Sequence, residues 1–444
     1  MPMAALAPSG NADATPRSFP TGVMLLLMLI YTLNFFDRQI LTILVEPIKA
    51  DLGLSDGQIG AISGLAFALL YSVAGFPLAR LADRTNRVYL IAGSLAVWSG
   101  FTILCGSTRN FTQMLLARVG VGVGEAGCTP AAHSLITDYV PRERRALALA
   151  MYQMGVPLGS LTGLAVGGIL VSTLGWRSAF LFAGIPGLVL AVIVPFVMRE
   201  PRRNAIAAAA PQIPFLEALR TLLGQRAFLL ICIGSGLSAF AFYGQATFMG
   251  SLYLRTHAAQ LAEAASAFAV PPTALLGILL GLMVGVCGGL GTFLGGLLSD
   301  RFARNSVAGY VRFGAIATIS SAPLFAFAPL AGDMRLSMIA LGGGLFCQTM
   351  SYGPIYAAIQ TLADPRMRGM AVAIQILFVN LIGLALGPLF VGMISDQLLA
   401  SAGPVQGLRI AMALVGVPML VGGLMFARAT TRMQREQDAA NQPQ

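Results

Sequence analysis

Charged residues are scarce in this chain of 444 residues, since Asp, Glu, Lys and Arg together make up 10% of it. A typical soluble domain carries about 25%. Lys49 is the only lysine, and the net charge of +10 is spread over short segments between apolar runs rather than gathered into one patch. That distribution argues against nucleic acid as a partner. The five cysteines lie within apolar stretches and show no CxxC or metal-ligand spacing, so we expect neither a disulfide framework nor a metal site.

Sequence signatures of catalysis are also missing. The chain has no HExxH or GxSxG motif, which argues against a membrane enzyme, and no GxxxxGK[ST] loop, which argues against an ATP-driven pump. We expect no catalytic residues and no cofactor. The first twenty residues are polar and lack a cleavable signal pattern, so we predict that they form a disordered tail.

Long apolar runs dominate what is present, and 56% of the residues are hydrophobic. A run of about 18 or more apolar residues is long enough to cross a bilayer as a helix. Only helices or closed barrels satisfy the backbone in lipid, so we predict an all-α membrane protein. The twelve predicted spans are 22–45, 58–81, 88–107, 112–139, 145–174, 178–198, 227–254, 274–299, 307–330, 335–361, 369–398 and 406–427.

The distribution of Lys and Arg predicts the orientation. The two terminal segments and the connections after the even-numbered spans hold twenty basic residues, whereas the opposite connections hold six. Basic connections stay in the cytoplasm. We therefore predict a multi-pass protein of a bacterial-type inner membrane with both termini cytoplasmic.

An internal repeat divides the chain into two halves. PRERRALALAMYQ begins at Pro141 and PRMRGMAVAIQ at Pro365, and the offset of 224 residues also aligns Gly159 with Gly383. Six spans per half indicate two pseudo-symmetric six-helix bundles related by an axis along the membrane normal. The predicted organisation is a tail (1–21), a first bundle (22–198), a cytoplasmic linker (199–226), a second bundle (227–427) and a cytoplasmic tail (428–444).

Two motifs resemble those of the major facilitator superfamily. That family carries approximately G-x-L-a-D-R-x-G-R-[KR] after its second span; this chain reads ARLADRTNRV over 79–88, which keeps the charges but departs at Ala79, Asn86 and Val88. The fourth span carries RVGVGVGEAG over 118–127. The resemblance covers essentially the whole chain and implies transport by alternating access.

A narrower resemblance is to the spinster branch of that superfamily. It rests on NFFDRQ at 34–39 and on the glutamate of GVGEAG at 122–127. The resemblance implies sphingosine phosphate or lysophospholipid substrates and coupling to protons.

Four ionisable residues stand out inside the predicted spans, because one near mid-membrane costs at least about 2.5–3.5 kcal/mol on insertion scales. Asp37 and Arg38 belong to the first span, and Arg118 and Glu125 to the fourth. Positions seven apart share a helix face, roughly 10 Å apart along its axis. We predict that Asp37 and Glu125 exchange protons while pairing with Arg38 or Arg118. Static ion bridges between the two helices are the alternative.

The same arginines could hold phosphate or carboxylate through paired hydrogen bonds. The second half offers polar and aromatic side chains without charge at mid-membrane, which suits the apolar part of an amphipathic substrate. Hydrogen bonds between packed helices are the alternative for each of them. The predicted substrate contacts are Asn34, Arg38, Arg118, Gln348, Tyr352 and Tyr356.

Two related segments, LADR at 81–84 and LSDR at 298–301, end even-numbered spans. In the superfamily this motif latches the outward-open state, because its aspartate faces the positive end of a neighbouring helix. A solvated, charged connection is the alternative. The predicted latch residues are Asp83, Arg84, Arg87, Asp300 and Arg301.

The sequence thus predicts a monomeric, proton-coupled secondary transporter of a lipid-like or small-molecule anion in contact with membrane lipids. A proton-coupled exporter of a drug or small organic metabolite is the main alternative, and a non-transporting membrane sensor is a more distant one.

Overall fold

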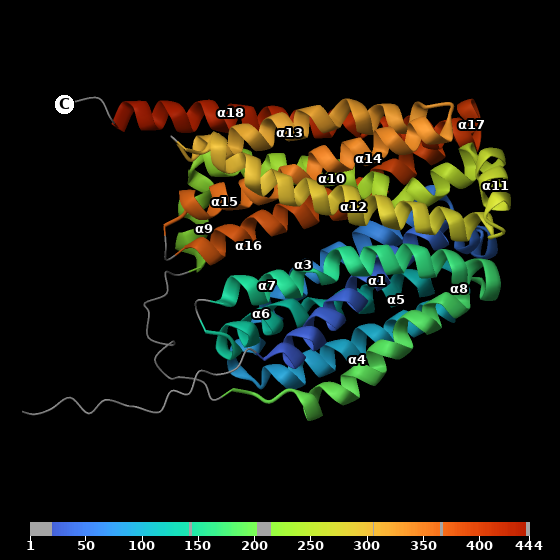
Figure 1. Cartoon of the computed structure of the whole chain (residues 1–444), viewed down its shortest axis with the longest axis horizontal. Coiled ribbons are helices and arrows are strands. Elements are labelled where there is room, and N and C mark those ends of the chain that lie inside the picture. Colours follow the sequence, from blue (N-terminus) through green and yellow to red (C-terminus); the bar gives the residue numbers. More distant parts are fainter. Residues whose placement is uncertain (1–19, 142–143, 202–214, 305, 365–366, 441–444) are drawn as a thin grey trace, which may run out of the picture.

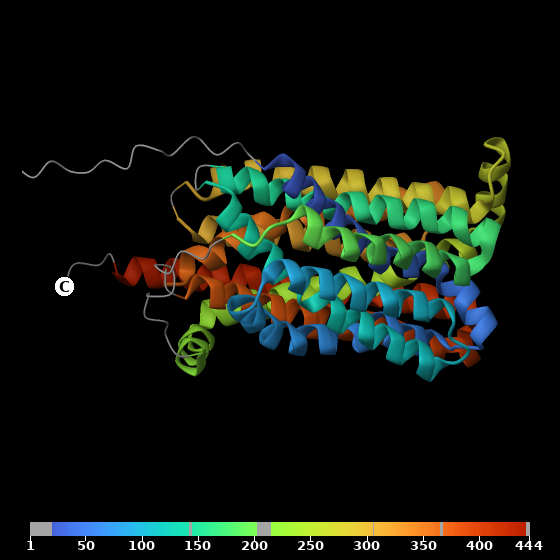
Figure 2. The same ribbon diagram turned by 90° about the horizontal axis from the view of Figure 1, so that it is seen from below.

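The structure is a computed structural model that describes residues 20–141, 144–201, 215–304, 306–364 and 367–440, and these residues form helices and no strand. Most helices run side by side along the long axis of the molecule (Figures 1 and 2). The described chain begins and ends at the same end of this bundle (Figures 1 and 2), which we call the terminal face. The far face is the opposite end, where the first helix stops at Leu52.

The first half of the chain supplies six spans. Their ends carry local signals: Gly53, with φ 64°, terminates the first helix, and the side chain of Ser55 forms a capping box with Gln58. The spans are α1 (Thr21–Leu52); α2, η1 and α3 (Asp56–Gly60, Ala61–Leu65 and Ala66–Arg84); α4 (Arg87–Gly106); α5 and α6 (Phe111–Ala126 and Cys128–Tyr139); α7 with the first part of α8 (Arg145–Gln153 and Gly155–Val197); and the second part of α8.

The second half repeats this plan. The predicted linker contains a short helix, α9 (Phe215–Gly224), while residues 202–214 lie outside the described residues. The spans are α10 (Arg226–Thr256); α12 (Pro272–Phe302); α13 with η4 (Ala308–Phe327 and Ala328–Leu330); α14 and α15 (Met334–Met350 and Tyr352–Leu362); α16, η5 and the first part of α17 (Arg368–Phe378, Val379–Ala385 and Leu386–Leu414); and the second part of α17 with α18 (Gly416–Ala440). A further short helix, α11 (Ala258–Ala267), follows α10.

Twelve spans follow from these elements, as predicted. Among the described residues, eight helical stretches are long and apolar enough to cross a membrane, and two of them are double spans. The chain turns inside α8 at Gly175 (φ 79°) and inside α17 at Gly403 (φ 76°), a backbone conformation that favours glycine. The remaining two spans, α5–α6 and α14–α15, are each divided by a turn, at Gly127 and Ser351. Those turns lie 224 residues apart, the offset of the sequence repeat.

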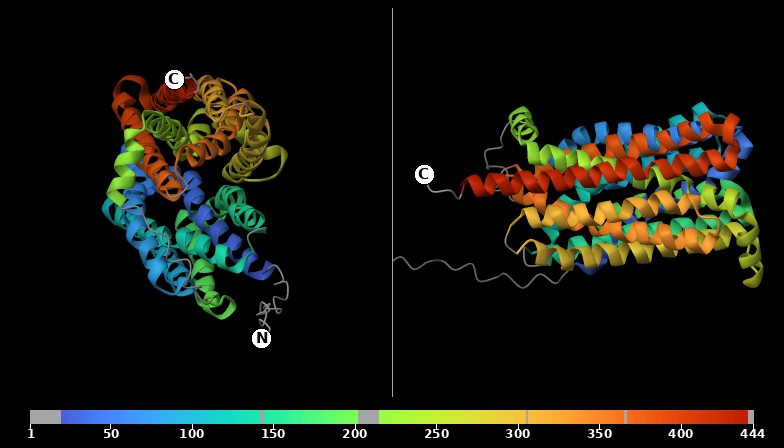
Figure 3. Two further views of the ribbon diagram at one scale, coloured as in Figure 1. Left: turned by 90° about the vertical axis from the view of Figure 1, so that its left-hand side faces the viewer. Right: turned by 90° about the horizontal axis from the view of Figure 1, so that it is seen from above.

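The two halves form two six-helix bundles, which an end-on view separates by colour (Figure 3). They contact each other through α8 with α12, α2 and η1 with α17, and α1 with α10. Small residues bring the backbones close: a Cβ on Gly277 would lie 2.2 Å from the Leu164 carbonyl oxygen, and one on Gly60 would lie 2.3 Å from that of Pro388. The closest contacts between the bundles therefore lie toward the far face.

Near the terminal face the helices of each half contact mainly helices of the same half. Helices α6 and α7 make their main contacts within the first half, and α15 and α16 make theirs within the second half. Tyr352 and Tyr356 are 44% and 40% exposed, although their helix, α15, contacts several neighbouring helices. The contacts between the two bundles are thus concentrated toward the far face.

Candidate functional site

An ion pair joins α1 and α5 inside the first bundle. Nε and Nη2 of Arg38 each lie 2.7 Å from Oε2 of Glu125. The Glu125 side chain has no exposed area, whereas that of Arg38 is 21% exposed. The second carboxylate oxygen of Glu125 has no hydrogen-bond partner among the described residues. The pair is therefore buried on its acidic side and open on its basic side.

Aromatic rings surround the Arg38 guanidinium. Its central carbon lies 4.7 Å from the ring centroid of Phe67, 5.0 Å from that of Tyr71 and 5.3 Å from that of Phe35. A desolvated cation over an aromatic face gains about 2 kcal/mol. The rings thus hold the cation in place independently of Glu125.

Asp37 points to a different partner. The Thr102 hydroxyl of α4 donates a hydrogen bond of 3.0 Å to Oδ2, and Oδ1 has no hydrogen-bond partner among the described residues. Asp37 is 1% exposed and lies close enough to Glu125 and Arg118 to interact electrostatically with both. The site therefore holds two buried carboxylates, of which one is paired with an arginine and the other with a hydroxyl.

Arg118 is 2% exposed and makes no ion pair within the described part of the chain. Its guanidinium carbon lies 5.5 Å from the Phe67 centroid, so Phe67 contacts both arginines of the site. The Arg118 charge compensates the two carboxylates at longer range. The structure thus brings all four predicted intramembrane charges together, but only Arg38 and Glu125 form a direct pair.

The other predicted substrate contacts differ in their surroundings. Asn34 lies one turn before Arg38 on α1 and is 4% exposed. Tyr352 and Tyr356 of α15 are partly exposed and available to a ligand. Gln348 is fully buried, and its amide nitrogen donates to the backbone oxygen and the hydroxyl of Ser238 on α10, at 3.0 and 3.1 Å. It joins α14 to α10.

A narrow, mostly apolar pocket lies between α1 and the second bundle. Gln39 is its lining residue on α1. Its walls come from α10, α12, α13 and α14. Lining residues include Gln39, Phe242, Met249, Met283, Phe325 and Leu341.

The predicted latch residues lie toward the terminal face. The Asp83 side chain lies outside the described residues. Arg84 and Arg301 are exposed, and Asp300 accepts a hydrogen bond of 3.0 Å from the Tyr310 hydroxyl. Arg87 is the most constrained of the set.

Arg87 is 1% exposed and ties three elements of the first bundle together. Its guanidinium lies 2.6 Å from Asp138 and 2.6 Å from Glu200, and it donates to Ser134 at 2.7 Å. The backbone N–H of Arg87 also donates to Glu200. The sequence predicted Arg87 but neither acidic partner, since both lie at helix ends where charges are ordinary.

Thr102 and Phe67 were missed for a different reason. Each lies in an apolar span among many similar residues, and only the three-dimensional packing brings them to Asp37 and to the two arginines. The sequence also did not indicate that Lys49 and Arg255 meet Asp56 at the far face. These two basic residues are among the six in the connections opposite the termini.

Comparison with known proteins places these features in a family. The model of the Major Facilitator Superfamily matches residues 27–388. An "MFS-type efflux pump" of Mycolicibacterium smegmatis is 35% identical over 411 residues, 92% of this chain and 92% of that protein. "Protein spinster homolog 1" of Mus musculus is 29% identical over 437 residues, which cover 92% of this chain and 80% of that one.

A solved structure shares the fold. The crystal structure of a bacterial homolog to the human lysosomal transporter Spinster, in an inward-facing and unoccupied conformation, superposes with a TM-score of 0.81 at 28% identity. The match covers 95% of this chain and 99% of the other. The matched family model, the two-bundle fold and the charged first and fourth spans agree: this chain belongs to the Major Facilitator Superfamily of membrane transporters, and within it resembles the spinster branch.

Proposed function

We propose that this protein is a proton-coupled secondary transporter that moves an amphipathic anion, of the sphingosine phosphate or lysophospholipid type, by alternating access. The observation that carries the proposal is the Arg38–Glu125 ion pair, which is buried on the acidic side, exposed on the basic side and enclosed by aromatic rings. Buried charges in a membrane bundle mark substrate or proton pathways far more often than they serve packing.

Proton exchange and anion binding would then compete at Arg38. While Glu125 is ionised, it occupies the guanidinium. A proton taken up by Glu125 neutralises it and frees Arg38 to hold a phosphate or carboxylate with two hydrogen bonds. Release of that proton restores the pair and expels the anion. Asp37 serves as the second proton-exchanging carboxylate, and Arg118 keeps the site from accumulating negative charge.

The apolar part of the substrate would lie along the second bundle. Tyr352 and Tyr356 are partly exposed, and Phe242, Met249 and Met283 give the second bundle an apolar surface beside α1. Methionine side chains adapt to irregular apolar ligands. Asn34 contributes a polar contact beside the headgroup, and Gln348 supports the wall by bridging α14 and α10.

We place the protein in a bacterial inner membrane with the terminal face in the cytoplasm, as the excess of basic residues there suggests. The state described is then open to the cytoplasm. Asp83, Arg84, Arg87, Asp300 and Arg301 would latch the opposite, outward-open state, and the protein would act as a monomer driven by the proton gradient without a cofactor.

A second candidate is proton-coupled export of a drug or small organic metabolite. The relative named as an efflux pump in M. smegmatis favours it. Transport into proteoliposomes of a panel of lysophospholipids, sphingosine phosphate and small organic anions, with and without a pH gradient, tests both. Gradient-stimulated transport of a lipid anion supports the first proposal, stimulation by small molecules alone supports the second, and no effect of the gradient contradicts both.

A further inference from the structure

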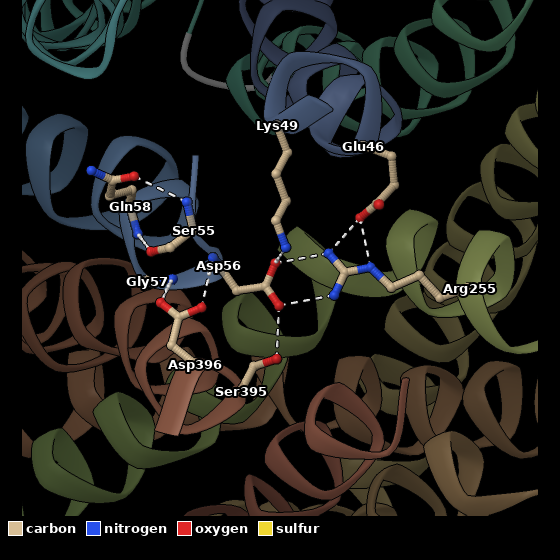
Figure 4. A network of polar contacts seen from close by, with 9 residues as sticks. All are labelled: Glu46, Lys49, Ser55, Asp56, Gly57, Gln58, Arg255, Ser395 and Asp396. Atoms are coloured by element: carbon tan, nitrogen blue, oxygen red, sulfur yellow. Dashed lines mark hydrogen bonds and ion pairs between the residues drawn. The ribbon is translucent and has the colours of Figure 1, made fainter. Parts of the chain in front are cut away.

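Asp56 lies at the start of α2 on the far face and is 3% exposed. Three side chains donate hydrogen bonds to its carboxylate (Figure 4). Lys49 donates to Oδ1 at 2.5 Å, and the Arg255 guanidinium contributes bonds of 2.7 and 2.9 Å to the two oxygens. The Ser395 hydroxyl donates to Oδ2 at 2.7 Å.

These partners come from both halves of the protein. Lys49 belongs to α1 in the first bundle, whereas Arg255 ends α10 and Ser395 lies in α17, both in the second bundle. Arg255 also reaches back across the boundary to Glu46 of α1, with bonds of 2.6 and 2.9 Å. Every bond made by Arg255 therefore connects the two bundles.

A second carboxylate completes the arrangement. Asp396 of α17 accepts the backbone N–H groups of Asp56 at 3.0 Å and of Gly57 at 2.8 Å. These N–H groups are free at the start of a helix, and an acidic side chain satisfies them. We call Glu46, Lys49, Asp56, Arg255, Ser395 and Asp396 the far-face lock.

The energetics of the lock suit a gate. Removing Asp56 leaves the Arg255 side chain, which is only 9% exposed, with Glu46 as its remaining ion-pair partner. Removing Arg255 takes the forked donor away from the Asp56 side chain, which is only 4% exposed, and such losses at buried charges are costly. Separating the two bundles as a whole instead returns every charge to water, and hydration then replaces the lost ion pairs. The ion pairs thus favour one closed arrangement of the two bundles. The free-energy cost of separating the bundles stays moderate, because hydration compensates for the lost pairs.

The helices that carry the lock are irregular next to it. A π-helical segment, η1 (Ala61–Leu65), follows α2, and another, η5 (Val379–Ala385), precedes the part of α17 that carries Ser395 and Asp396. The two segments contact each other across the bundle boundary. Such irregular segments recur at functional sites of helices. A π-helical segment therefore lies between each of these lock-bearing helix ends and the rest of its span.

We infer that Asp56 and Arg255 are positioning residues for the transport cycle: together they hold the far face closed, and their separation is the step that opens the substrate pathway to that side. This inference concerns the conformational equilibrium and is independent of the substrate and of the role of Glu125.

Spin labels at positions 109 and 401 measure the far-face separation, since Arg109 and Ser401 are exposed there and belong to different bundles. The pair is introduced into a cysteine-free background, and distances are recorded by pulsed electron paramagnetic resonance without substrate. We expect one short-distance population in the parent protein. Asp56→Asn and Arg255→Gln should each raise the ratio of the long- to the short-distance population at least tenfold, equivalent to about 1.4 kcal/mol.

Asp51→Asn is the matched control. Asp51 pairs with Arg177 at the same end of the molecule, but both residues belong to the first bundle. The control should leave the distances unchanged. Arg255→Lys, which keeps the charge but loses the forked geometry, should give an intermediate ratio and replaces the other variants if they do not fold.

Two results would overturn the inference. Distance distributions of Asp56→Asn and Arg255→Gln that match the parent would show that the lock does not hold the closed state. An equal opening in Asp51→Asn would show that any lost charge at this face has the same effect.

Discussion

Replacing Glu125 with glutamine separates proton coupling from folding, because the amide keeps the shape of the protonated acid and has no proton to release. The structural cost follows from the Arg38–Glu125 pair. Removing one partner of a fully buried ion pair costs about 3–5 kcal/mol. The Arg38 side chain is 21% exposed, three rings flank it, and the glutamine oxygen still accepts its hydrogen bond. We therefore expect a loss of only about 1–2 kcal/mol.

In chains of about 150–250 residues, each kcal/mol of lost stability lowers the melting temperature by about 2–4 °C. The shift per kcal/mol is smaller in a longer chain, so we expect a drop of only a few degrees here. Transport should respond very differently. Uptake driven by a pH gradient in proteoliposomes should fall to the level of protein-free liposomes, since the cycle requires Glu125 to lose a proton in every turn. Counterflow, in which labelled and unlabelled substrate exchange without net proton movement, should persist.

Asp51→Asn again provides the control, because it makes the same chemical change in a carboxylate of α1 that is exposed and remote from the site. It should retain gradient-driven uptake. Wild-type uptake by Glu125→Gln under the same gradient would refute the coupling role. Loss of both uptake and counterflow, with an unchanged melting temperature, would assign Glu125 to substrate binding instead.

Three further outcomes are expected. Asp37→Asn should also abolish gradient-driven uptake, and retained uptake would restrict coupling to the other carboxylate. Arg38→Ala should weaken binding of an anionic substrate by roughly 10- to 100-fold, the value of charge-assisted hydrogen bonds of about 1.5–3 kcal/mol, as measured by ligand titration. Tyr356→Ala should weaken it less, and the reverse order would point to a neutral or cationic substrate. Arg87→Gln should lower the melting temperature in detergent by several degrees, because it leaves two carboxylates without their cation. Arg84→Gln, at an exposed position, should not, and equal shifts would contradict the structural role of Arg87.

The spans and the repeat could be predicted because hydrophobic length and the backbone's need for hydrogen bonds act locally. The helix boundaries agree to within a few residues for most spans. The last helix is the main exception, since α18 continues to Ala440, beyond the end predicted at 427. Arginines in that stretch, such as Arg428 and Arg435, mark where the apolar pattern stops, and a helix can continue past that point into water.

The sequence predicted that the intramembrane charges would meet, but not which residues would pair. A charge deep in a span needs a partner, and Asp37, Arg38, Arg118 and Glu125 were the four that stood out. That Arg38 pairs with Glu125, and Asp37 with Thr102, depends on the rotation of α1 against α4 and α5. Side-chain direction at that precision comes from packing between spans, which one sequence does not specify.

The far-face lock was invisible for a related reason. Lys49, Asp56, Arg255 and Asp396 lie near the ends of spans, where charges are expected in any membrane protein. Nothing in their spacing connects positions more than three hundred residues apart. The contact of Asp396 with the start of α2 arises only when the two bundles meet.

The repeat itself bears on where the chemistry lies. Shifted by 224 residues, Glu125 corresponds to Thr349 and Arg118 to Gly342, and both pairs lie just before the equivalent turns at Gly127 and Ser351. Thr349 donates its hydroxyl hydrogen to the backbone of its own helix, and a Cβ on Gly342 would meet Cys287 and Met283. The second half thus keeps the broken helix but fills its face with packing and apolar contacts. The amphipathic anion proposed above would therefore meet a charged wall in the first bundle and an apolar wall in the second, which a pair of identical bundles could not provide.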